Sequence, residues 1–189
     1  MSSKSSAAAN GQALWTKQPK ANAELFALTY GALVTEVVGD ADGNAQEINE
    51  QLEQIGYSIG IRCIDEFLAK SNVPYCKNLE ETAYVLGKTA FKMFLGINCD
   101  IQQHSQKSFS LILQENPLSL FVELPEEYKD TLQYTIIYCG VIRGALEMLN
   151  YKVDCTLVKS TLRGDDVDEI KVDLKSVLQD GAGDDYHEE

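Results

Sequence analysis

Cys76 is the residue whose setting in the sequence most clearly suggests chemistry. It stands directly before Lys77 and two residues before Asn78, which has a side chain typical of a helix N-cap. A helix N-terminus and a neighbouring cation both favour the thiolate form of cysteine, and the thiolate is the form that attacks an acyl thioester. The sequence therefore marks Cys76 as a candidate for acylation, with an unreactive loop thiol as the alternative.

The helix predicted after Cys76 carries small side chains along one stripe, which can leave a groove. These residues are Ala83, Gly87 and Ala90, with Leu86 beside them. Sixteen helical residues span about 24 Å, close to the length of a long acyl chain. Burying such a chain contributes about 0.8 kcal/mol per methylene. The alternative is that larger side chains from a facing element fill the stripe, as is usual in close-packed interiors.

Other catalytic and metal-binding motifs are weak in this sequence. The two histidines are His104, expected in a polar loop, and His187, expected in a C-terminal tail. Neither has a partner at the spacing of a metal site or a catalytic triad. An acyltransferase that uses Cys76 as its nucleophile would need a base, and no histidine lies near it in sequence. We therefore expect no metal and no catalytic site belonging to this chain alone.

Composition restricts the class of protein further. The chain has 189 residues, 44% of them hydrophobic, which fits one domain with a sizeable core. Its net charge of −13 argues against nucleic acid and against electrostatic docking on an anionic membrane. Five cysteines without a CxxC motif favour free thiols in a reducing compartment. With no signal-peptide pattern and no long apolar run, we expect a cytoplasmic protein.

The chain divides into three segments by composition. Residues 1–21 are rich in Ser, Ala, Lys and Gln and predict a disordered N-terminal arm. Residues 22–179 predict a single α+β domain. Residues 180–189 form an acidic tail with five carboxylates and no lysine or arginine.

Helical periodicity dominates the central domain. Apolar residues recur at steps of three and four in four stretches, which begin at cap-type or polar residues and end near glycine, proline or polar turns. The predicted helices span 22–39, 44–71, 78–96 and 130–149. Gly56 and Gly60 lie four apart on one face of the second helix, which indicates close approach of another element. That element is either inside the monomer or on a partner subunit.

Alternating apolar and polar residues predict strands at 109–113, 153–157 and 170–174. The turn residues Arg163–Asp166 join the last two as a hairpin. One face of these strands is apolar, so we expect about four main helices packed on one side of a small antiparallel sheet. Strands do not alternate with helices, which disfavours a doubly wound nucleotide-binding fold.

Five blocks of ten to eighteen residues resemble a known family, the Bet-three subunits of the transport protein particle (TRAPP) vesicle-tethering complex. The resemblance covers about residues 24–175. Its blocks are ELFALTYGALVTEV (24–37), GYSIGIRCIDEFLAKSNV (56–73), KTAFKMFLGI (88–97), FSLILQENPLSLFVELP (109–125) and CGVIRGALEML (139–149).

This resemblance implies an α+β fold with an apolar tunnel that holds a fatty acyl, or palmitoyl, chain on a cysteine. The family's cysteine aligns with Cys76, and its small tunnel residue aligns with Ala90. The implied tunnel lining is Ala83, Leu86, Gly87 and Ala90. A chain buried in this way cannot also insert into a bilayer, so its implied role is stability or shape, and membrane contact is only indirect.

The resemblance also implies a function. The chain would be a core subunit of a tethering complex in ER-to-Golgi transport, peripheral to cis-Golgi and ER-derived membranes. It would form a homodimer, or a heterodimer with related small subunits. Within the assembly it would contribute to nucleotide exchange on a Rab-type GTPase, with Glu188 and Glu189 of the tail as implied GTPase contacts. The alternative function is a protein that binds or senses a hydrophobic small molecule such as a lipid.

Overall fold

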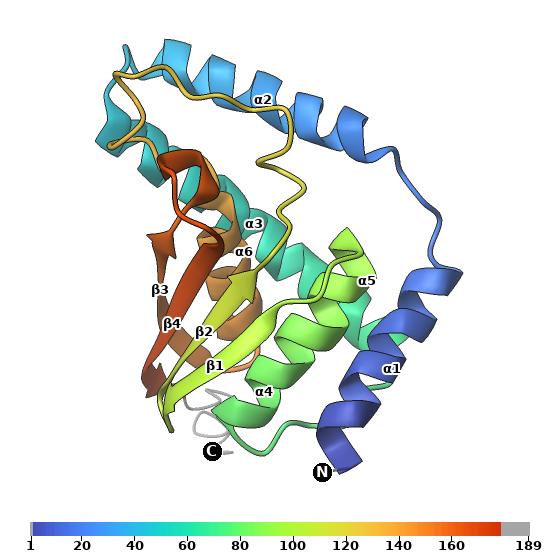
Figure 1. Cartoon of the computed structure of the whole chain (residues 1–189). Coiled ribbons are helices and arrows are strands. Elements are labelled where there is room, and N and C mark those ends of the chain that lie inside the picture. The colour runs from blue at the N-terminus through green and yellow to red at the C-terminus, as the bar shows by residue number, and fades with distance from the viewer. Residues whose placement is uncertain (1, 179–189) are drawn as a thin grey trace, which may run out of the picture.

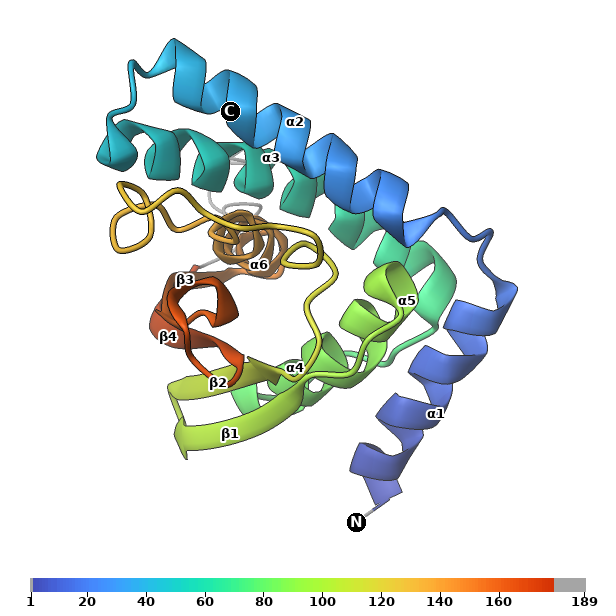
Figure 2. The same cartoon turned by 45° about the horizontal axis from the view of Figure 1, so that its top comes forward.

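The structure, a computed structural model, describes residues 2–178, which form helices packed on one antiparallel sheet (Figure 1). In chain order the elements are α1 (Ser2–Lys17), α2 (Ala23–Asp40), α3 (Ala45–Ser71), α4 (Leu79–Val85), the π-helical turn η1 (Leu86–Ala90), α5 (Phe91–Leu95), β1 (Asp100–Ser105), β2 (Ser108–Leu113), α6 (Ile137–Glu147), β3 (Tyr151–Lys159), the 3-10 turn η2 (Thr161–Arg163) and β4 (Asp168–Val177). Figure 2 shows α6 between the sheet and α3, with α2 outermost. The predicted α+β class is confirmed.

Asparagine caps fix where three of the helices begin, as the sequence predicts. The Asn22 side chain accepts a hydrogen bond from Leu25 N at the start of α2. Asn44 does the same for α3, and Asn78 for α4. Each cap satisfies backbone N–H groups that have no partner within the helix.

The sheet has the strand order β1-β2-β4-β3, with all neighbours antiparallel. Phe109 pairs with Val172 and Leu111 with Ile170, and all four side chains are fully buried. The predicted hairpin is present as β3 and β4. Its connection turns at Gly164, whose φ of 95° favours glycine. The apolar inner face of the sheet thus forms the floor of the main core.

Glycines bring α3 and α6 into backbone contact. A Cβ on Gly56 would overlap the carbonyl oxygen of Ile137, and one on Gly60 would overlap that of Val141. In return, Gly140 and Gly144 of α6 face the backbone of α3. The close approach expected at Gly56 and Gly60 is therefore made inside the monomer.

A π-helical turn interrupts the predicted helix 78–96. The turn η1 follows α4, and Phe91 N donates to Leu86 O across it. A π turn holds one residue more than an α turn, so it rotates the rest of the helix relative to the start. As a result Ala83 and Gly87 face the sheet, whereas Ala90 packs in a separate apolar cluster.

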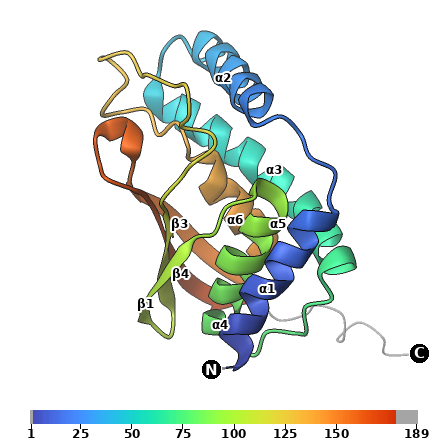
Figure 3. The same ribbon diagram turned by 45° about the vertical axis from the view of Figure 1, so that its right-hand side comes forward.

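Residues 2–17 are helical and packed, where the sequence predicts a disordered arm over 1–21. Helix α1 lies beside α4 and α5 (Figure 3). Gly11 is buried against the backbone of Lys88, and the Trp15 ring covers Gly96. Leu14 is only 7% exposed. The expectation fails because α1 packs through small residues at close range, and amino-acid composition does not reveal such close backbone contacts.

Two further boundaries differ from the sequence expectation. His104 lies in β1, a polar edge strand whose residues lack the apolar alternation that identifies strands. Helix α6 begins at Ile137 rather than near Asp130, because residues 126–136 form a series of turns. The predicted tail 180–189 lies outside the described residues.

Candidate acylation site

Cys76 lies in the loop between α3 and α4, with its side chain about half buried. Burial raises the pKa of its thiol, and the Glu81 carboxylate raises it further, while a hydrogen bond with Thr82 acts in the opposite direction. The net direction is upward, so the thiol is protonated at neutral pH. The activation expected from the helix N-terminus and Lys77 is therefore not what the structure shows.

The hydrogen bonds at the N-terminus of α4 add to the effect of burial. Asn78 Oδ1 accepts from Glu81 N at 2.9 Å, and Glu81 Oε2 accepts from Lys77 N at 2.9 Å. These two bonds resemble a capping box, except that the Glu81 carboxylate accepts from the residue before the N-cap rather than from the N-cap itself. They occupy N–H groups that would otherwise favour a thiolate, and they hold a negative charge at the helix start.

The four predicted tunnel residues are divided between two apolar clusters. Ala83 is fully buried in the main core, and Leu86 is half buried against it. A Cβ on Gly87 would lie 3.1 Å from Ile101 Cδ1 and 3.2 Å from Leu111 Cδ2, so the sheet fills that side. Ala90 belongs to the second cluster. A single lining made by all four residues is not what the structure shows.

A smaller group of packed apolar residues connects α1, α3, α5 and neighbouring elements. We call this group the second apolar cluster. Its buried members are Leu14, Ile64, Phe67 and Met93, and its partly buried members are Val73, Val85, Ala90, Ala145 and Leu149. Sequence reasoning missed Leu14, because the arm was expected to be disordered. The signal was the spacing of Ala7, Gly11 and Leu14, which places them on one helical face.

Two surface hollows lie away from Cys76. One, of about 420 Å³, is lined mainly by apolar residues of α2 and of the segment 120–134. The other, of about 460 Å³, is lined by polar residues of α3 and by Thr131, Gln133 and Ile136. Neither is lined by Cys76 or by the four predicted tunnel residues.

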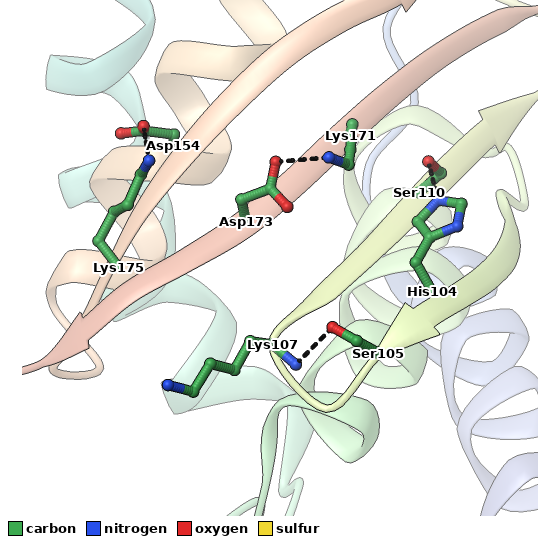
Figure 4. A network of polar contacts seen from close by, with 8 residues as sticks. All are labelled: His104, Ser105, Lys107, Ser110, Asp154, Lys171, Asp173 and Lys175. Carbon is green, nitrogen blue, oxygen red and sulfur yellow. Dashed lines mark hydrogen bonds and ion pairs between the residues drawn. The ribbon is translucent and has the colours of Figure 1, made fainter.

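The outer face of the sheet carries a polar network rather than a reactive site (Figure 4). His104 Nε2 lies 2.8 Å from Ser110 Oγ, and Lys171 pairs with Asp173 at 3.0 Å. Hydrogen bonding from Ser108, followed by Lys171, lowers the pKa of Asp173. Across residues 2–178 no three acidic, histidine or cysteine side chains gather as a metal site would require. In the same part of the chain, no helix is both long and apolar enough to cross a membrane.

Comparison with known proteins gives a consistent match over this fold. The profile of the transport protein particle (TRAPP) component family matches residues 26–173. Trafficking protein particle complex subunit 3 of Dictyostelium discoideum is 51% identical over 172 residues, covering 90% of this chain and 92% of the relative. Subunit BET3 of the Saccharomyces cerevisiae complex is 45% identical over 175 residues, covering 91% of each.

A solved structure agrees with these sequence matches. The crystal structure of trafficking protein particle complex subunit 3 from Naegleria fowleri, covalently bound to palmitic acid, superposes with a TM-score of 0.79 at 48% identity. The match covers 84% of this chain and 98% of that chain. The sequence profile, the close relatives and the shared fold together show that this chain belongs to the TRAPP component family.

Proposed function

We propose that this chain is a core subunit of a vesicle-tethering complex that acts in ER-to-Golgi transport, at the cytoplasmic side of Golgi and ER-derived membranes. The observation that carries the proposal is the match to TRAPP components over residues 26–173, supported by relatives that are subunits of trafficking protein particles. Its contribution to nucleotide exchange on a Rab-type GTPase would come from the assembled complex. The proposed GTPase contacts Glu188 and Glu189 lie outside the described residues.

Helix α2 offers the surface for pairing with a related subunit or a second copy. Leu25 and Leu28 are each 64% exposed, and Phe26 is 43% exposed. The apolar hollow beside α2 adjoins them, and its rim carries the exposed side chains of Leu120 and Phe121. A contiguous apolar surface of this kind typically marks a protein interface.

Affinity purification of the tagged chain from its own cells tests this assembly. The wild type is expected to recover several small related subunits, with exchange activity in the eluate and none in the isolated chain. The double variant Leu25→Asp, Leu28→Asp is expected to lose most of these subunits, because two carboxylates would be buried unpaired. Gln102→Asp, on the exposed outer face of the sheet, is the control and should retain them. A wild-type chain that emerges alone would overturn the assembly proposal.

Cys76 is the proposed site of a covalently held palmitoyl chain. A relative at 48% identity is covalently bound to palmitic acid, and Cys76 is a half-buried thiol beside Thr82 at the start of α4, the helix whose Val85 belongs to the second apolar cluster. The Cys76 sulfur would attack the carbonyl carbon of an acyl-thioester donor. A new C–S bond forms, the donor's C–S bond breaks, and the departing thiol takes up the proton. Because the pKa of Cys76 is raised, this reaction is expected to accelerate as pH rises above neutral.

Intact mass measurement of the full chain tests this modification. Wild-type protein is expected to carry an acyl mass that hydroxylamine removes, and Cys76→Ser is expected to lack it. Cys63→Ser, which changes another half-buried thiol, is the control and should keep the adduct. An acyl mass that persists in Cys76→Ser would contradict the assignment. A lipid that solvent extracts without hydroxylamine would instead favour the lipid-binding alternative.

A further inference from the structure

Helix α1 precedes the residues matched by the family profile, and it is anchored to the helix that follows Cys76. The family profile begins at residue 26, whereas α1 ends at Lys17. Thr89 Oγ1, fully buried in η1, donates to Ala7 O at 2.9 Å. Asn10 Nδ2 donates to Ser71 O, also at 2.9 Å. The N-terminal helix is thus tied at two points to elements that flank the Cys76 loop.

The contact face of α1 admits one large side chain into the apolar interior. Gly11 lets the helix backbone approach η1 closely, since a Cβ there would overlap Lys88 O. One turn later, Leu14 enters the second apolar cluster beside Ile64, Phe67 and Met93. Leu14 therefore belongs to a helix that precedes the residues matched by the family profile, and it packs with residues that lie within that match.

Residues along α4, η1 and α5 lead from Cys76 toward Leu14. Thr82 lies against Cys76, and Val85, Ala90 and Met93 follow it in the second apolar cluster. The α-helical rise of about 1.5 Å per residue places Met93 about 16 Å beyond Thr82. That is the length scale of a long fatty acyl chain.

The other side of this helix is closed to such a chain. Ile101 and Leu111 already occupy the space beside Gly87, and Ala83 is fully buried. By contrast, the residues of the second apolar cluster nearest the loop are only partly buried. An acyl chain on Cys76 therefore meets less resistance toward α3 and α1 than toward the sheet, because displacing well-packed core side chains is costly.

We propose that α1 closes the far end of the acyl site and that Leu14, with Met93, sets the longest chain that Cys76 accepts. This inference rests on the proposed acylation of Cys76. It makes Leu14 a specificity-determining residue in a helix that precedes the profile match. Since α1 is docked through small residues and two hydrogen bonds, shortening Leu14 or lifting α1 would lengthen the site.

The test uses purified full-length chain and an equimolar mixture of myristoyl-, palmitoyl- and stearoyl-coenzyme A at mildly alkaline pH. Intact mass gives the distribution of chains on Cys76. Wild type is expected to favour palmitoyl over stearoyl. Leu14→Ala removes three carbon atoms from the wall and is expected to shift the preference by about two carbons, toward stearoyl. Gly11→Val, which pushes α1 away from Lys88, is expected to broaden the distribution in the same direction.

Gln12→Ala is the matched control, since Gln12 is exposed on the opposite side of α1. It should leave the distribution as in wild type. An identical distribution in wild type, Leu14→Ala and Gly11→Val would overturn the role of α1 while leaving acylation intact. No adduct on Cys76 in any variant would overturn the acylation itself, and the inference with it.

Discussion

Replacing Gly56 by alanine is expected to lower the free energy of unfolding by about 3 kcal/mol. A methyl group there would overlap Ile137 O and lie within 3.1 Å of Ile137 Cα, so α3 and α6 must separate. Alanine gains about 1 kcal/mol of helix propensity over glycine, which offsets only part of this cost. At about 2–4 °C per kcal/mol for a chain of this size, the melting temperature should fall by roughly 6–12 °C.

Gly39 supplies a control of the same chemistry. It also lies in a helix, α2, but a Cβ there would meet nothing within 4 Å. Gly39→Ala is therefore expected to stabilise the protein by about 0.4–1 kcal/mol. Urea denaturation of both variants measures the difference. If Gly56→Ala proves as stable as wild type, α3 and α6 are not in backbone contact, and the packing described above is wrong.

Asp168 is expected to produce the second large loss of stability when it is changed. Its side chain is only 1% exposed, and Oδ2 accepts from Asn116 Nδ2 and from Thr161 Oγ1, both at 3.1 Å. Oδ1 accepts from Thr161 N at 3.2 Å. The carboxylate thus connects the start of β4 to two loops. Asp168→Ala leaves the buried Asn116 amide without its acceptor, at a cost of about 2–3 kcal/mol.

The near-isosteric variant Asp168→Asn makes the test sharper. Asn116 is fixed in orientation, because its Oδ1 accepts from Leu118 N and from Tyr138 Oη. It cannot flip to suit a new amide without breaking those bonds. If an asparagine at 168 keeps the hydrogen bond from Thr161 N, its side-chain NH2 group faces the Nδ2 group of Asn116. Two donors then face each other, and we expect the free energy of unfolding to fall by about 1–2 kcal/mol.

Asp166→Asn is the control for this substitution, since Asp166 is exposed in the same connection. Its effect should stay within about 0.5 kcal/mol. Thermal unfolding at neutral pH compares the three variants. Equal stability of Asp168→Asn and wild type would show that the Asn116–Asp168 bond contributes nothing to the fold.

Local signals in the sequence predicted what depends on single elements. Asn22, Asn44 and Asn78 marked helix starts because each side chain caps its own backbone within three residues. The alternation of residue types in β2 and in the β3–β4 hairpin identified the sheet, because apolar side chains such as Phe109 and Val172 share its inner face and mostly polar ones lie on the outer face. For the same local reason, Gly56 and Gly60 signalled a close contact before its partner on α6 was known.

What the sequence did not predict depends on fit between distant segments. Gly11 and Ala7 look like spacer residues until η1 is placed against them. The pKa of Cys76 is set by the depth of its burial and by the capping role of Glu81, and neither follows from spacing alone. The strand β1 has Ile101 as its one apolar residue, so no alternation marks it and only its pairing with β2 reveals it.

The π-helical turn η1 rotates the two parts of one continuous helix, α4 and α5, relative to each other. Ala83, before the turn, is buried in the main core, and Gly87, within it, meets side chains of the sheet, whereas Ala90, at its last position, packs in the second apolar cluster. Apolar residues on both sides of the turn contact both interiors, since Val85 before it packs in the second apolar cluster and Phe91 after it packs in the main core. The extra residue therefore changes which small residues face each interior.

Removing one residue from this turn would restore regular α-helical geometry. It would also rotate Ala90 and Met93 by about 100° away from α1. The length of this turn, rather than the identity of its residues, thus decides which residues of α5 face each interior.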